Sequence, residues 1–146
     1  MMDISIKETD KYGKSLYTER PFKTGELIFT ICGPIVKTPT VYTIPITDEL
    51  LIDPQPYGKY LCHSCNPNCG IKSRTLVMAM RDIEKGEEIT IDYAMIVYEY
   101  GDEISEKERI CRCGNQNCRG SFGSYKELSD ELKQKYRGFI SEYLTD

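Results

Sequence analysis

The sequence predicts a mostly β domain of several small sheets, followed by a carboxyl-terminal helix. Short runs of β-branched and aromatic residues, broken by Gly and Pro, fill the first two thirds of the 146-residue chain. Such runs with turn residues between them are typical of short strands. Near the carboxyl terminus, apolar residues instead repeat at a spacing of four, which is the period of a helix face. A chain of this length can bury a core as a single unit.

The strands are expected in five runs. Gly25 in "KTGE" and Gly86 in "EKGEE" each precede one of these runs, and both fit tight turns because glycine tolerates a positive φ. The five runs are KSLYTE (14–19), ELIFTICG (26–33), PIVKTPTVYTIPI (34–46), TLVMAM (75–80) and EEITIDY (87–93).

The helix is expected within residues 124–144. Its apolar stripe consists of Leu128, Leu132, Tyr136 and Ile140, and it indicates a helix that covers one face of the core. Ser129 is followed three residues later by Leu132, so a capping box does not define the start of the helix.

Composition narrows the classes of function. The net charge of -4 argues against a nucleic-acid-binding surface over the whole domain, because phosphate contacts need clustered Lys and Arg. We therefore expect no direct contact with nucleic acid and a basic protein or peptide as partner. The acidic run from Tyr98 to Glu108 could attract such a peptide, although runs of this kind are usually solvated faces.

No segment approaches the roughly 18 apolar residues that a membrane span needs, and no secretory signal is evident, so we expect no membrane association. An intracellular protein is expected, cytoplasmic or nuclear. Seven cysteines are an odd number. In a reducing compartment they are metal ligands or buried apolar groups more often than disulfides.

Two cysteine-rich stretches raise the question of a metal. "CRCGNQNCRG" carries Cys111, Cys113 and Cys118 in a loop rich in turn residues, and three thiols at this spacing can occupy three corners of a zinc tetrahedron. A fourth ligand must come from elsewhere. The stretch "YLCHSCNPNCG" (60–70) offers four candidates, namely Cys62, His63, Cys65 and Cys69.

Other interpretations of the cysteines stay open. Cys32, Cys62 and Cys69 fit small buried apolar groups better than ligands. A cysteine nucleophile would need a base, and His63 directly follows Cys62, where adjacent strand side chains point to opposite faces. A zinc ribbon that binds nucleic acid would use both clusters as separate sites and hold two zinc ions.

Three motifs in order, "YLCHSCNPNCG", "KGEEITIDY" and "CRCGNQNCRG", resemble the signatures of SET-domain lysine methyltransferases with a post-SET zinc loop. The segment "YGKSLYTERPFKTGELIFTICGPIV" is similar to the opening of that domain, so the resemblance covers about residues 4–120. It implies the β-clip SET fold, with small sheets around a pseudoknot. It also implies a SET domain at 1–110, a post-SET zinc loop at 111–120 and a helical extension at 121–146.

The resemblance implies the roles of individual residues. Tyr93 corresponds to the catalytic tyrosine, and Cys65 supplies the fourth ligand of one structural zinc ion. The cofactor would be S-adenosylmethionine, with S-adenosylhomocysteine as product. Contacts to the cofactor fall on Lys14, Ser15, Leu16, Lys59, Cys62, His63 and Tyr93, and the zinc ligands are Cys65, Cys111, Cys113 and Cys118.

Several positions depart from the family pattern. Cys62 replaces an asparagine, Ser15 replaces a glycine, and Ile31 and Pro34 replace an aromatic residue and a glutamate. Ile91 stands where the family has Phe or Tyr, a position that sets the number of methyl groups added. The predicted function is S-adenosylmethionine-dependent methylation of lysine in a basic protein such as a histone. The alternative is a non-catalytic SET-fold module that binds zinc and cofactor.

Overall fold

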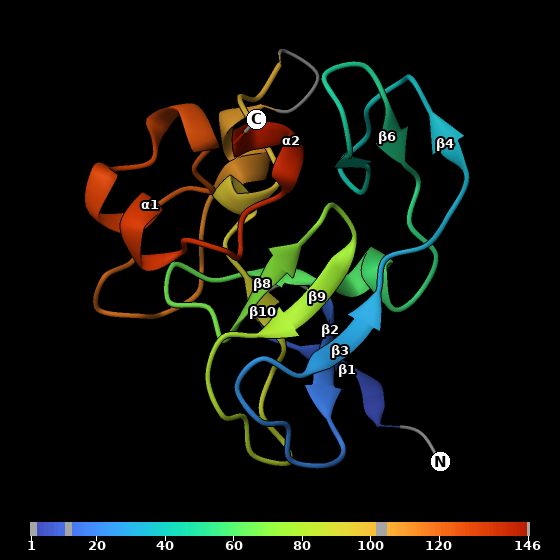
Figure 1. Ribbon diagram of the computed structural model, residues 1–146, viewed down its shortest axis with the longest axis vertical. Helices are drawn as coiled ribbons and strands as arrows, with labels where there is room; N and C mark the ends of the chain where they lie inside the picture. Colours follow the sequence, from blue (N-terminus) through green and yellow to red (C-terminus); the bar gives the residue numbers. More distant parts are fainter. Residues whose placement is uncertain (1–2, 11–12, 102–104, 146) are drawn as a thin grey trace.

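The computed structural model describes residues 3–10, 13–101 and 105–145. Within them the strands form four small sheets, and the helical segments near the carboxyl terminus cover one side (Figure 1). A hairpin of β1 (Ile4–Thr9) and β2 (Gly13–Thr18) pairs Ile4 with Thr18 in antiparallel register. In Figure 1 this hairpin lies at the end of the molecule opposite α1 and α2.

Two three-stranded sheets form the body. The central one is antiparallel and has the order β3 (Leu27–Thr30), β9 (Leu76–Ala79), β8 (Cys69–Lys72). The other has the order β4 (Ile35–Val36), β6 (Leu51–Ile52), β5 (Ile44–Pro45). The turns before β3 and before β10 contain Gly25 and Gly86 at φ +84° and +89°, as predicted for these two glycines.

The fourth sheet joins two of the three motifs. Strand β7 (Cys62–His63) pairs in parallel with β10 (Thr90–Ile91), so that Cys62 lies opposite Thr90 and His63 opposite Ile91. Three short 3-10 helices flank the motifs: η1 (Gly58–Tyr60), η2 (Tyr93–Met95) and η3 (Glu106–Arg109). The first and second motifs therefore lie side by side.

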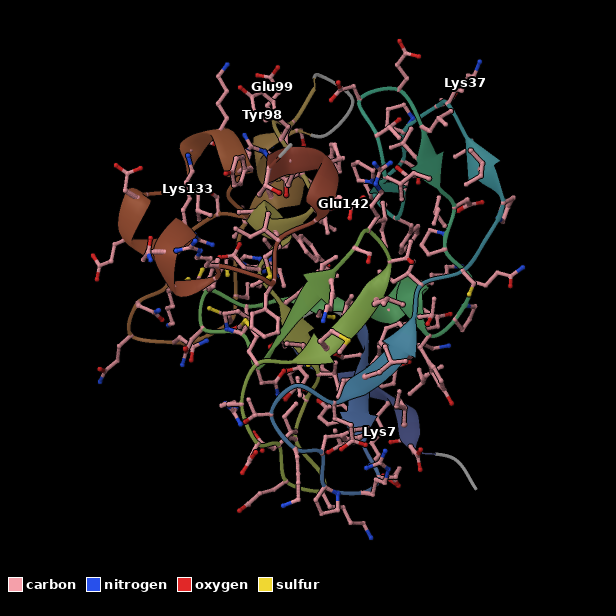
Figure 2. The ribbon with its side chains drawn as sticks, in the orientation of Figure 1. Lys7, Lys37, Tyr98, Glu99, Lys133 and Glu142 are labelled. Carbon is pink, nitrogen blue, oxygen red and sulfur yellow. The ribbon has the colours of Figure 1, made fainter. Side chains whose placement is uncertain are left out.

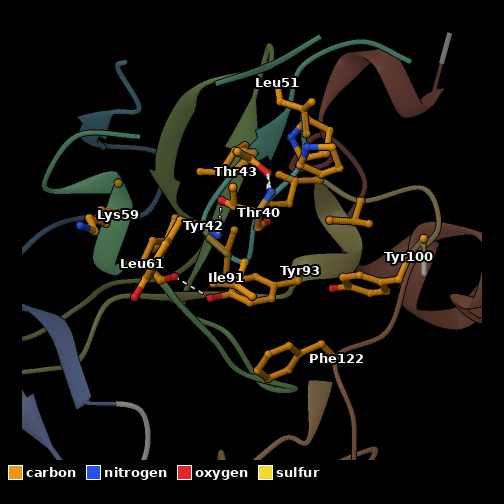
Figure 3. A pocket seen from close by; sticks show the side chains of 18 of the residues that line it. Thr40, Tyr42, Thr43, Leu51, Lys59, Leu61, Ile91, Tyr93, Tyr100 and Phe122 are labelled. Carbon is orange, nitrogen blue, oxygen red and sulfur yellow. Dashed lines mark hydrogen bonds between the residues drawn. The ribbon is translucent and has the colours of Figure 1, made fainter. Parts of the chain in front are cut away.

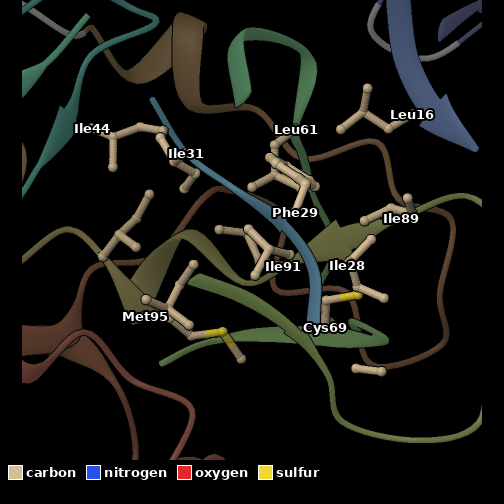
Figure 4. Close-up of a cluster of buried hydrophobic side chains, with 14 of the residues drawn as sticks. Leu16, Ile28, Phe29, Ile31, Ile44, Leu61, Cys69, Ile89, Ile91 and Met95 are labelled. Atoms are coloured by element: carbon tan, nitrogen blue, oxygen red, sulfur yellow. The ribbon is translucent and has the colours of Figure 1, made fainter. Parts of the chain in front are cut away.

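The core gathers side chains from all of these segments (Figure 4). Leu16, Ile31, Ile89 and Ile91 are each at most 2% exposed. Each such burial contributes about 1.5–3 kcal/mol relative to leaving the side chain in water. Ile91 is part of this core and also belongs to the parallel pair, so the motif strand is fixed by packing as well as by hydrogen bonds.

The carboxyl-terminal segment is helical but not one helix. It consists of η4 (Tyr125–Glu127), α1 (Asp130–Lys135) and α2 (Glu142–Thr145). Ser129 caps α1 by accepting a hydrogen bond from the Leu132 N–H, and Gly138 at φ +88° turns the chain after it. The predicted stripe still faces the core, since Leu128 and Tyr136 are buried.

Among the described residues, the structure contains no helix that is both long enough and apolar enough to cross a membrane. Most charged side chains point outward, as Lys7, Lys37, Lys133 and Glu142 do in Figure 2. Cys32 is exposed and corrects the prediction of a buried thiol at this position. The chain alternates after β3, so Ile31 points into the core and Cys32 points away from it.

Candidate active site and metal centre

Tyr93 is held by the segment that precedes and includes β7. Its hydroxyl donates a hydrogen bond to the Leu61 carbonyl at 2.7 Å, and its backbone N–H donates to His63 Nδ1 at 3.0 Å (Figure 3). The ring of Tyr93 also packs edge-on against Phe122, with 5.0 Å between the centroids. The hydroxyl and the backbone N–H of Tyr93 are therefore both fixed by hydrogen bonds that join the first two motifs.

A cleft of about 1060 Å³ opens beside Tyr93. Its wall is mixed: charged side chains line part of it, and Figure 3 shows the aromatic and aliphatic side chains Tyr42, Ile91, Tyr93, Tyr100 and Phe122 around it. Because the Tyr93 hydroxyl donates its proton to the Leu61 carbonyl, any further hydrogen bond of the phenol oxygen must be one that it accepts.

His63 is a neutral, buried imidazole. Since Nδ1 accepts the hydrogen bond from Tyr93 N–H, the proton must reside on Nε2, and Nε2 lies 3.4 Å from Cys65 Sγ. Burial lowers the pKa of His63 to about 4, and the neighbouring Asp92 only partly offsets this. His63 thus connects Tyr93 to the cysteine cluster through its two ring nitrogens.

Asp92 is a fully buried carboxylate that precedes Tyr93. Oδ1 accepts from the Ala94 N–H at 3.0 Å and caps η2. Oδ2 accepts from the Tyr136 hydroxyl at 2.9 Å and from the Arg119 guanidinium at 2.5 Å. A buried carboxylate is costly without such partners. Its partners come from three separate parts of the chain.

The structure brings Cys65, Cys111, Cys113 and Cys118 together. Their four sulfur atoms all lie within 4.8 Å of one another, and Cys65 Sγ is 3.7 Å from Cys111 Sγ. A zinc tetrahedron with Zn–S bonds of about 2.3 Å needs sulfur separations of roughly 3.8 Å. The four thiols therefore fit a structural zinc site in both chemistry and spacing, and Cys62 and Cys69 lie outside the group.

Backbone N–H groups donate to two sulfur atoms of the cluster, although burial still raises the pKa of the Cys65 thiol. The Arg119 N–H donates to Cys65 Sγ at 3.3 Å, and the Gly120 N–H donates to Cys118 Sγ at 3.4 Å. Burial opposes ionisation of Cys113, but the backbone N–H groups of Asn115 and Cys65 outweigh it and lower its pKa to about 6. Thiolates are the form that binds metal.

The residues expected to contact the cofactor divide into two groups. Lys14, Lys59, Cys62 and Tyr93 line the cleft. Lys14 Nζ lies 5.6 Å from the centre of the Tyr60 ring, and Lys59 Nζ lies 5.2 Å from that of Tyr42. The Cys62 thiol approaches the Lys14 carbonyl at 3.6 Å, and burial raises its pKa to about 11.

Ser15, Leu16 and His63 are buried and are not among the residues that line the cleft. The Ser15 hydroxyl donates to Glu88 at 2.5 Å, and Leu16 packs in the core. Any contact of these residues with a cofactor would have to be made by the backbone or through their neighbours.

Sequence reasoning did not single out Phe122, Arg119 or the hydroxyl of Tyr136. Phe122 packs against both His63 and Tyr93, with centroid distances of 4.9 and 5.0 Å. Arg119 follows the last cysteine directly, which could have suggested a role at the cluster. Tyr136 was recognised as part of an apolar stripe, and a tyrosine in a stripe gives no sign of which partner its hydroxyl meets.

Comparisons with known proteins place these features in a family. A family model described as "SET domain" matches residues 13–94. Histone-lysine N-methyltransferase NSD3 of Mus musculus is 27% identical in an alignment that covers 83% of this chain and 10% of that protein. Histone-lysine N-methyltransferase ASHH3 of Arabidopsis thaliana is 28% identical, covering 82% of this chain and 38% of that protein. The chain thus spans a minor part of each of these relatives.

Two solved structures are also similar. The crystal structure of KRYPTONITE in complex with mCHG DNA and SAH aligns with a TM-score of 0.69 and 21% identity, over 82% of this chain and 29% of that one. Its complex with mCHH DNA, an H3(1-15) peptide and SAH gives 0.70 and 20%, over 84% and 30%.

Proposed function

The chain belongs to the SET-domain family and has its mostly β fold, and on this premise we propose that it is an S-adenosylmethionine-dependent protein-lysine N-methyltransferase. The observation that carries the proposal is Tyr93, which lies at the cleft wall with its hydroxyl bonded to the Leu61 carbonyl and its backbone N–H bonded to His63 Nδ1. Homologues named histone-lysine N-methyltransferases support the reaction.

S-adenosylmethionine, when bound, would supply the methyl group on a sulfonium. Lys14, Lys59, Cys62 and the backbone around His63 are the groups proposed to hold it. The Lys59 ammonium, which lies at the cleft wall, would face the carboxylate of the cofactor. Neighbours solved with SAH support this choice of cofactor.

The chain must accept lysine in its neutral form, although a lysine amine has a pKa of about 10.4 in water. The aromatic and aliphatic wall around Tyr93 disfavours the ammonium by desolvation, which lowers the pKa of an inserted lysine. The phenol oxygen of Tyr93, with its proton committed to Leu61, then accepts a hydrogen bond from the amine N–H. This contact aligns the nitrogen lone pair for attack.

A structural zinc ion bound by Cys65, Cys111, Cys113 and Cys118 is the second part of the proposal. The metal would join the loop at 111–120 to the segment that carries Cys65. It has no step in the chemistry. Its effect on Tyr93 would pass through His63, which contacts both the Cys65 sulfur and the Tyr93 backbone.

We propose a basic protein as substrate, of the histone kind. Asp48, Glu49 and Glu99 line the cleft and offer carboxylates to Lys and Arg residues beside the target. The wall of the cleft also carries basic side chains, those of Lys14, Lys37, Lys59, Lys107 and Arg112. Part of the acidic run at 98–108 contributes here, while residues 102–104 lie outside the described part of the chain. One neighbour was solved with an H3 peptide and with DNA. The absence of direct contact with nucleic acid stays a prediction, as does an intracellular location.

The second candidate is a non-catalytic module that binds zinc and cofactor. Cys62 favours it, because its thiol is engaged with the Lys14 and Tyr60 carbonyls and cannot replace the amide contacts of the asparagine usual there. Such a module would bind the cofactor without transferring its methyl group.

The deciding experiment incubates the protein with methyl-labelled S-adenosylmethionine and a panel of basic proteins that includes histones. Label recovered as methyl-lysine supports the enzyme. Calorimetry with the same cofactor distinguishes the two candidates. Cofactor binding without methyl transfer to any member of the panel would support the non-catalytic module and contradict the proposed enzyme.

A further inference from the structure

The carboxyl-terminal segment, residues 121–145, forms hydrogen bonds with the residues that follow Tyr93. The Ser141 N–H donates to the Met95 carbonyl at 2.8 Å, and the Tyr143 hydroxyl donates to the Ile96 carbonyl at 2.5 Å. Tyr125 and Lys126 donate their N–H groups to the carbonyls of Val97 and Tyr98 at 2.7 and 3.0 Å. Four consecutive backbone carbonyls, at residues 95–98, thus accept hydrogen bonds from this segment.

Tyr136, from the same segment, forms a hydrogen bond with Asp92, the residue before Tyr93. Its side chain is 0% exposed, and its hydroxyl donates to Asp92 Oδ2, which is also 0% exposed. The other oxygen of Asp92 caps η2 through Ala94 N–H, and η2 begins at Tyr93. A change in the rotamer of Asp92 would therefore remove the cap and let the turn that carries Tyr93 move.

We propose that Tyr136 is a positioning residue for methyl transfer, which fixes Asp92 and through it the turn that presents Tyr93. The inference rests on the proposed function. It assigns the helical extension a part in the reaction, beyond its cover of the core, although Tyr136 is not among the residues that line the cleft. Arg119 shares Oδ2, so Asp92 keeps one charged partner when the Tyr136 hydroxyl is removed.

The test is Tyr136→Phe in the full chain, which deletes one oxygen and keeps the ring. A misplacement of about 1 Å costs about a hundredfold in rate, and a smaller shift of Tyr93 is expected here, so kcat should fall roughly tenfold. The peptide KM and the cofactor Kd should stay within about twofold. Tyr125→Phe is the matched control in the same segment, since the Tyr125 ring lies under Lys133 and its backbone bond to Val97 is kept.

A double-mutant cycle separates positioning from general loss of structure. If Tyr136 acts through Tyr93, adding Tyr136→Phe to Tyr93→Phe should lower the residual rate by less than about twofold. An equal tenfold loss in both backgrounds, or a tenfold rise in KM, would overturn the proposal.

Amide hydrogen exchange reports independently of activity. Residues 92–98 should exchange several-fold faster in Tyr136→Phe than in the wild type or Tyr125→Phe, while β9 should be unchanged. Unchanged exchange in 92–98 contradicts the positioning contact. Should the wild type transfer no methyl group, the proposed function fails, and the exchange data still decide whether Tyr136 holds the turn.

Discussion

The Arg119 guanidinium lies 2.5 Å from Asp92 Oδ2, and the backbone N–H of the same residue donates to Cys65 Sγ at 3.3 Å. One residue of the cysteine loop therefore contacts both the cluster and the carboxylate that precedes Tyr93. The side chain of Asp92 is 0% exposed and that of Arg119 is 28% exposed. The pair is thus largely withdrawn from water.

Replacing Arg119 by Met should destabilise the protein by about 2–4 kcal/mol, because it leaves a buried carboxylate with one fewer charged partner. The control is Arg81→Met, which breaks the ion pair with Glu87 at 2.9 Å, where the Arg81 side chain is 54% exposed. There the expected loss is about 0–1 kcal/mol. Urea unfolding of both variants measures the difference, and equal losses would contradict a structural role of the Arg119 pair.

The cysteine cluster should hold one zinc ion per chain. Cys113→Ser should lose the metal, and its loop at 111–120 should become sensitive to protease, because metal binding and folding of such a site are coupled. Cys32→Ser is the control, since that thiol is exposed and distant from the cluster. Metal analysis of the purified protein is the measurement. Two zinc ions per chain would favour the zinc ribbon instead.

Two buried thiols outside the cluster should make stability fall at high pH. Burial raises the pKa of Cys62 to about 11 and that of Cys69 to about 12, against 9.0 for an exposed thiol. The unfolded chain loses these protons first, so their stabilisation is complete below pH 9 and is lost as the pH rises from 9 toward 11–12.

The same shifts predict reactivity. At pH 9, iodoacetamide should modify the exposed Cys32 in the native protein and leave Cys62 and Cys69 unmodified. Peptide mapping by mass spectrometry gives the extent at each site. Modification of Cys62 as fast as Cys32 would show that its environment is not apolar.

Ile91 should allow more than one methyl group to be added. It is fully buried, lines the cleft, and provides no hydroxyl that could hold a water or the amine. Ile91→Tyr should shift the products toward monomethyl-lysine, and Ile91→Phe, with similar volume and no hydroxyl, should not. Mass spectrometry of products at long reaction times decides. A single methyl group per site from the wild type would contradict this prediction.

The sequence was sufficient to predict the family, the small sheets and the residues of the cysteine cluster, because each motif combines residue types whose chemistry is specific. Strands β2, β3, β9 and β10 overlap predicted runs, whereas β1, β6, β7 and β8 were not predicted and the run at 34–46 contains only the short strands β4 and β5. Gly25 and Gly86 adopt the positive φ that their turns require. The boundaries at 110 and 120 stay a prediction, as do the roles of the individual site residues.

Other features depended on tertiary contacts that local sequence does not encode. The spacing-four stripe predicted one helix, yet Gly138 interrupts it, and the buried stripe residues Leu128 and Tyr136 lie at the ends of two short helices, η4 and α1. Nothing in the sequence around Asp92 indicates that Arg119 and Tyr136 contact it, because they lie 27 and 44 positions further along the chain. Cys32 was predicted to be buried and is exposed, because Ile31 takes the inward position.

Methyl transfer by the wild type and Tyr93→Phe under single-turnover conditions tests the central claim most directly. Both proteins, saturated with labelled cofactor, are mixed with the best substrate from the panel, and their fold and zinc content are compared first. The account predicts that the variant keeps its fold and metal and transfers roughly a hundredfold more slowly, since one oriented acceptor has been removed. Equal rates of methyl-lysine formation would contradict it.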